Sequence, residues 1–112
     1  MSAPRLDRPV LLEAAQRSAD GAGGFVETWL ALGSLWAELQ PRGGRATDGP
    51  AGGLSQGRYR AVVRAAPVGH GMRPVPGQRL RMGPRVFTIE AVTEMPGDGM
   101  YLRCDVIEEV AV

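Results

Sequence analysis

Residues 25–40, FVETWLALGSLWAELQ, determine whether this 112-residue chain is expected to be helical or built from strands. Trp29, Leu32 and Trp36 have the spacing of one apolar stripe on a helix. On either side of Gly33, however, apolar residues alternate with period two, as they do in a half-buried strand. Because a Gly-Ser step interrupts the stretch at this point, we predict two strand segments that meet at Gly33.

The segments that follow also favour strands. Residues 58–66, RYRAVVRAA, alternate between arginine and apolar side chains. Residues 79–82 and 85–94 flank a tight Gly-Pro turn, and a Pro-Gly loop leads to a last strand at residues 100–110. The side chains that these strands are expected to direct into the core are Tyr59, Ala61, Val63, Leu80, Met82, Leu102, Cys104 and Val106.

The part of the chain before residue 25 predicts a first strand at residues 6–15, with Val10 and Leu12 on its inner face, and a polar turn at residues 17–24. The chain contains 16 glycines and 9 prolines, which favours many turns and short strands over long helices. We therefore expect an all-β fold, in which residues 1–112 form a single small barrel or sandwich of about six strands.

Residues 41–57, PRGGRATDGPAGGLSQG, predict a long flexible loop inserted in this domain. They hold six glycines and two prolines, and Leu54 is their only large apolar side chain. Loops longer than about 12–15 residues are uncommon in compact domains and are usually functional or disordered. The loop is therefore the first candidate for a functional segment.

Composition excludes several classes of function. The 13 basic residues, all arginines, nearly balance 12 acidic ones, and a net charge of +1 gives no global field for binding nucleic acid or membranes. No apolar stretch has the length of a signal peptide or a spanning helix, so we expect a cytosolic protein. Cys104 is the single cysteine, and its place in an alternating strand predicts a small buried hydrophobe.

The residue types needed for catalysis are scarce. His70 is the only histidine, and it lies in a Gly/Pro-rich connector where an exposed imidazole is expected. Glu108 and Glu109 are adjacent, but neighbours on a strand point to opposite faces and do not form an acid-base pair. Nothing has metal-ligand spacing. We therefore expect no catalytic residues, no metal and no cofactor.

Two sets of side chains are candidates for an interaction surface. One is a basic face, which either meets phosphates or, as we favour, is solvated or pairs with carboxylates between subunits. The other is a set of large aromatic residues that lie in the core or at an assembly interface, with the core as the default. The basic residues are Arg58, Arg60, Arg64, Arg79 and Arg81, and the aromatic residues are Trp29, Trp36 and Phe87.

The order of several motifs is similar to that of a known family. LDRPVLLEAAQ at residues 6–16 is followed by VETW at 26–29, LWAELQP at 35–41, GGR at 43–45 and, later, GPRVFTIEAV at 83–92. With the alternating strand at residues 59–64, this pattern resembles the phage head-tail joining family, the small head-tail adaptor and head completion proteins, over about residues 6–107.

The resemblance implies a non-catalytic β-barrel that assembles in the bacterial cytoplasm into a six-fold or twelve-fold ring. The ring would occupy the neck of a phage, prophage or gene transfer agent particle as a stopper or adaptor. A portal or adaptor protein would lie above it, and a tail-terminator or tail-tube protein below it. By analogy, the loop at residues 41–57 would enter the lumen and help to retain double-stranded DNA. The loop residues assigned to this role are Arg42, Gly43, Gly44, Arg45 and Leu54.

Two other functions remain open from the sequence. The same small barrel would suit a tail-completion or tail-terminator protein, because such virion modules share shapes and differ mainly in their partners. It would also suit a monomeric nucleic-acid-binding barrel, although the near-neutral net charge argues against this.

Overall fold

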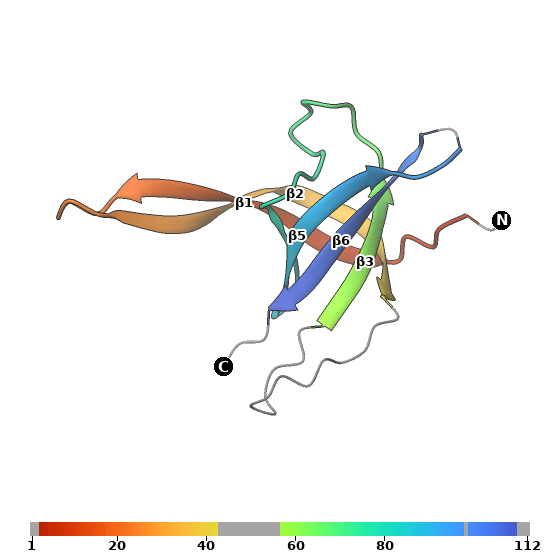
Figure 1. The fold of residues 1–112 in the computed structure, drawn as a ribbon, viewed down its shortest axis with the longest axis horizontal. Coiled ribbons are helices and arrows are strands. Elements are labelled where there is room, and N and C mark those ends of the chain that lie inside the picture. Colours follow the sequence, from red (N-terminus) through yellow and green to blue (C-terminus); the bar gives the residue numbers. More distant parts are fainter. Residues whose placement is uncertain (1–2, 43–56, 98, 110–112) are drawn as a thin grey trace.

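The computed structural model describes residues 3–42, 57–97 and 99–109, and these form an all-β fold of six antiparallel strands, as predicted. The strands pair in the order β1-β2-β3-β6-β5-β4, and β4 pairs back with β1, so the sheet closes into a barrel (Figure 1). Their bounds are β1 Arg8–Ala19, β2 Phe25–Pro41, β3 Gly57–Arg64, β4 Arg79–Met82, β5 Arg85–Glu94 and β6 Tyr101–Glu109.

β2 is one continuous strand and not two segments, and the glycine inside it marks a β-bulge. Leu12 pairs with Gly33 while Glu13 pairs with Ala31, so Leu32 is an extra residue on the β2 side of the ladder. A Cβ atom at Gly33 would lie 2.6 Å from the sulfur of Met72, so a larger residue at this position would require the end of the Met72 side chain to move. The Gly-Ser step therefore changes the register of the strand without ending it.

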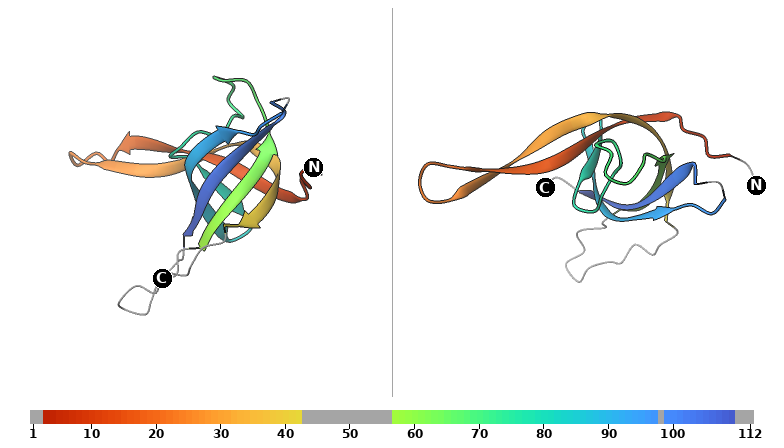
Figure 2. Two further views of the ribbon diagram at one scale, coloured as in Figure 1. Left: turned by 45° about the vertical axis from the view of Figure 1, so that its right-hand side comes forward. Right: turned by 90° about the horizontal axis from the view of Figure 1, so that it is seen from above.

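Beyond the bulge, β1 and β2 leave the barrel together as a two-stranded ribbon, residues 14–31, which we call the arm (Figures 1 and 2). β1 pairs with β4 only at residues 11–13, and β2 pairs with β3 only at residues 37–41. With the arm extended along its longest axis, the molecule measures 54 × 39 × 21 Å (Figure 1). At its tip, Asp20 Oδ1 accepts hydrogen bonds from the amides of Ala22 at 2.7 Å and Gly24 at 3.0 Å. The turn thus begins at Asp20, three residues later than predicted.

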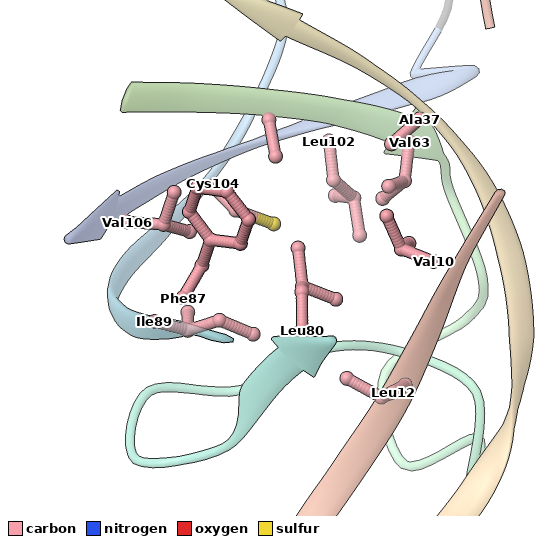
Figure 3. Packing of buried hydrophobic residues seen from close by; sticks show 11 residues of the cluster. Val10, Leu12, Ala37, Val63, Leu80, Phe87, Ile89, Leu102, Cys104 and Val106 are labelled. Carbon is pink, nitrogen blue, oxygen red and sulfur yellow. The ribbon is translucent and has the colours of Figure 1, made fainter. Parts of the chain in front are cut away.

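The core lies inside the barrel and is filled by the side chains that alternate inward from the strands (Figure 3). Phe87 is the largest of the fully buried side chains, and its ring meets that of Tyr59 edge to face, with the centroids 5.5 Å apart. All the predicted inward side chains are buried in this core or packed against it. The buried members are Val10, Leu12, Ala37, Ala61, Val63, Leu80, Phe87, Ile89, Leu102, Cys104 and Val106.

The connector between β3 and β4, residues 65–78, lies across one end of the barrel in the view from above (Figure 2). Its Pro74 is fully buried, and Arg73 Nη1 donates a hydrogen bond to the carbonyl of Ala66 at 2.9 Å. His70 is exposed, and its Nδ1 accepts a hydrogen bond from the amide of Met72 at 3.0 Å. The connector therefore closes the core at this end.

Cys104 is buried as predicted, and this leads to an expectation about its reactivity. Burial raises the pKa of the Cys104 thiol to about 12, so the reactive thiolate is scarce at neutral pH. We expect a colorimetric disulfide reagent to modify Cys104 slowly in the folded protein and within seconds in denaturant. Equal rates in the two conditions would contradict the burial of this side chain.

Candidate assembly surfaces

The two faces of the arm differ in chemistry. Residues opposite each other in an antiparallel pair share a face, so Glu27 lies across from Arg17, and Phe25 and Trp29 flank them. On this face, Arg17 stacks over the ring of Phe25, with the guanidinium carbon 4.9 Å from the ring centroid. The opposite face has no ionisable side chain and consists of Ala14, Gln16, Ser18, Val26, Thr28 and Leu30.

A buried ion pair fixes the base of the arm to β4. The Glu13 side chain is only 6% exposed, and its Oε1 accepts a hydrogen bond from Arg79 Nε at 2.6 Å. Arg81 Nη1 lies 3.6 Å from the other carboxylate oxygen of Glu13, Oε2, but the Arg81 side chain is half exposed. The Arg79 guanidinium also stacks on Trp29, 4.0 Å from the centroid. This contact holds the first part of the arm against the outer wall of the barrel.

The role of Glu13 was not predicted from the sequence. The signal was present, because Glu13 is the one charged residue within the run VLLEAA at residues 10–15. A charge within such a run is either exposed or paired, and the arginines at 79 and 81 were available as partners. Without the register of β1 against β4, however, no pattern in the sequence links residues 66 positions apart.

The predicted basic face is divided between two sides of the barrel. β3, which carries Arg58, Arg60 and Arg64, is not a neighbour of β4, which carries Arg79 and Arg81. Arg79 and Arg81 pair with Glu13, and Arg60 lies 3.9 Å from Asp105, so these carboxylate pairs form within one chain. Among the described residues, the exposed Arg58 and Arg64 have no ion-pair partner.

Arg42, the last described residue before the predicted loop, is bound to the outer wall of β5 and β6. Its two terminal nitrogens lie 3.8 Å from Glu90 and from Asp105, and Nη2 donates a hydrogen bond to the carbonyl of Val106 at 3.4 Å. Its guanidinium is thus engaged within the chain. The other loop residues assigned to DNA contact, Gly43, Gly44, Arg45 and Leu54, lie outside the described residues.

The aromatic candidates have three different environments. Phe87 is in the core, as predicted, and Trp29 is half-buried under Arg79. Trp36 points outward and is 59% exposed, so the core interpretation is wrong for this residue. The reason is register, because Leu35 and Ala37 occupy the inward positions on β2 and Trp36 lies between them. Trp36 therefore lies on the outer surface of the barrel.

Arg85 and Glu108 form a second carboxylate pair, at the end of the barrel near β5 and β6. Arg85 Nε and Nη2 donate hydrogen bonds to the two carboxylate oxygens of Glu108 at 2.7 and 3.0 Å. These bonds hold the pKa of Glu108 below its ordinary value of 4.5. Glu109 instead accepts a hydrogen bond from the hydroxyl of Thr88 at 3.0 Å. The adjacent glutamates thus have separate structural roles.

This pair predicts a pH-dependent contribution to stability. A carboxylate with a lowered folded pKa stabilises the fold above its unfolded pKa, and the stabilisation is lost as the pH falls through the folded value. We expect Glu108→Gln to lower the urea midpoint near neutral pH by an amount equivalent to about 0.5–1 kcal/mol, since Arg85 is partly exposed. At about pH 3 the difference from the unmodified protein should disappear. Glu109→Gln is the control, and a midpoint difference that persists in acid would contradict the assignment.

No group of three histidine, cysteine or carboxylate side chains in the described part of the chain could hold a metal ion. Within the same residues, no helix is long and apolar enough to cross a membrane. The candidate functional surfaces in the described part of the chain are the arm, the outer wall around Trp36, and the exposed arginines without an ion-pair partner, Arg58 and Arg64. These features suit contacts between proteins.

Comparison with known proteins identifies the family. A family model described as phage head completion protein matches residues 1–110. The chain belongs to the phage head completion protein family. A head completion chain is a structural protein of a phage-like particle, and the sequence-based resemblance is thereby confirmed.

A solved structure supports this placement. It is titled "Virion of native gene transfer agent (GTA) particle", and one of its chains is similar to this head completion protein with 46% identity and a TM-score of 0.82. The match covers 97% of this chain and 100% of the other. Among curated proteins, none matches the chain.

Proposed function

We propose that this head completion protein forms a ring in the neck of a phage-like or gene transfer agent particle and joins the portal-bearing head to the tail. The observation that carries the proposal is the family match over residues 1–110 together with the likeness to a chain of an assembled virion. In such a ring, a portal or adaptor protein contacts one side, and a tail-terminator or tail-tube protein contacts the other.

The shape of the protomer supports a role in assembly over the action of an isolated monomer. A two-stranded ribbon is marginally stable by itself, and the arm exposes Phe25, Val26 and Leu30. Exposed apolar side chains on an extended ribbon favour contacts with other proteins. The net charge of +1 gives little support to the monomeric nucleic-acid-binding alternative.

We further propose that the ring helps to retain packaged DNA. The chain segment suited to this is the loop at residues 41–57, whose greater part lies outside the described residues. Because Arg42 is engaged with Glu90 and Asp105, Arg45 is the better candidate for a nonspecific phosphate contact in this loop. This role for the loop stays a prediction.

Electron microscopy of particles made with and without this gene tests the proposed function. We expect the deletion to yield tailless heads that have lost their DNA, and a restored gene copy to return filled, tailed particles. Particles with normal heads and tails in the deletion strain would refute a role in the neck. Full heads without tails would retain the joining role and refute the retention of DNA.

A further inference from the structure

The arm has one face that combines an exposed aromatic ring with an unpaired carboxylate. Phe25 is 65% exposed, and Glu27, two residues away on the same face, is also exposed. Arg17 lies across from Glu27 but stacks on Phe25, and among the described residues Glu27 has no ion-pair partner. An aromatic residue next to an acidic one is therefore displayed near the tip of the arm.

A hollow of complementary chemistry lies at the other end of the molecule. Leu6, Trp36 and Arg64 line a surface hollow of about 300 Å³ on the outer wall of the barrel. This volume is at the lower limit of the roughly 300–1,000 Å³ range of ligand pockets, so it suits one or two side chains. Arg64 is exposed and has no ion-pair partner in the described part of the chain. The hollow thus offers an aromatic wall and an unpaired positive charge.

We propose that the arm of one copy docks in the Trp36 hollow of a second copy, with Phe25 against Trp36 and Glu27 against Arg64. The two surfaces are complementary. The apolar ring of Phe25 would fill the hollow beside Trp36. The carboxylate of Glu27 would pair with the guanidinium of Arg64. This inference rests on the proposed ring, and it names the contact that joins neighbouring protomers.

The position of the two surfaces argues for a second copy as the occupant. The arm leaves the barrel at one end of the 54 Å axis, whereas Trp36 pairs with Pro9 close to the N-terminal segment at the other end (Figure 1). One chain therefore cannot satisfy both surfaces by itself. A contact between different surfaces of identical chains is heterologous, and such contacts form closed rings when the rotation between copies closes.

Crosslinking in assembled particles tests this contact directly. Glu27→Cys and Arg64→Cys, combined in one chain, keep both aromatic residues, and the native Cys104 is fully buried. With a short bismaleimide, we expect the double variant to give a ladder of multimers of this chain, and each single variant to give none. A particle that contains the double variant but gives no ladder would overturn the proposal. So would a crosslink that joins the Glu27→Cys single variant to a different particle protein. Particles of the unmodified strain that lack this chain altogether would instead refute the proposed function.

A charge exchange provides a second test that does not depend on crosslinking. We expect Glu27→Arg and Arg64→Glu each to reduce the yield of tailed particles by about tenfold or more, as repulsion replaces attraction. The two changes together should restore most of the yield. A double variant no better than either single one would overturn the contact. Val68→Ser, at an exposed apolar residue outside both surfaces, is the control and should leave the yield unchanged.

Discussion

Replacing Phe87 with alanine is expected to cost about 3–5 kcal/mol of unfolding free energy, the largest effect of any single change considered for this protein. Phe87 is 1% exposed and contacts Tyr59 edge to face inside the barrel. Alanine would remove this ring and leave a cavity that the closed strands cannot collapse to fill. Since the free energy of unfolding of native proteins is about 5–15 kcal/mol, this substitution would remove a large part of it. Urea denaturation followed by tryptophan fluorescence measures the difference.

The chain provides a matched control for this variant in its other phenylalanine. Phe25 is 65% exposed on the arm, so Phe25→Ala should change the stability of the isolated protein by no more than about 0.5 kcal/mol. Phe87→Leu, which keeps most of the buried volume, should fall between the two alanine variants. A similar cost for both alanine variants would contradict the described core.

Replacing Arg79 with methionine is expected to have the second largest effect, a loss of about 3 kcal/mol. Methionine replaces the guanidinium that stacks on Trp29 with an unbranched apolar side chain of similar length, and it leaves the Glu13 carboxylate buried without its closest partner. Removal of one member of a buried ion pair is costly because the remaining charge stays desolvated. Urea denaturation again measures the loss.

Arg81→Met is the matched control on the same strand. Arg81 contacts the same carboxylate but at 3.6 Å, and its side chain is 48% exposed. Exposed ion pairs contribute about 0–1 kcal/mol, so its loss should be small. If the two methionine variants are equally stable, Glu13 does not depend on Arg79, and the base of the arm is not held as described.

The strands and the core were predictable because they follow local patterns. Alternation placed Val63, Leu102 and Val106 in the core correctly, and the Gly-Pro and Pro-Gly turns set the limits of β5 and β6 to within a residue or two. The Gly-Ser step at residues 33–34 led correctly to strand and not helix for residues 25–40, although β2 is continuous across it. Each of these inferences needed only neighbours in the sequence.

The arm and the surfaces around it were not predictable, because they depend on which strands become neighbours. A polar stretch such as RSA at residues 17–19 resembles a turn when considered alone, yet cross-strand pairs with Phe25, Val26 and Glu27 keep it extended. The outward position of Trp36 required the register of β2. The separation of the arginines on β3 from those on β4 required the order of strands in the barrel. These properties are set by tertiary contacts and leave no periodic signal.

The filled core of the barrel limits how any particle built from this chain can form a channel. The interior of the protomer is occupied by side chains such as Leu80, Phe87 and Leu102, and the connector with Pro74 covers one end. No solute, and least of all a duplex, can therefore pass through the axis of a single barrel. In the proposed ring, a DNA conduit would therefore run between protomers, and its bore would be set by how many copies surround the axis.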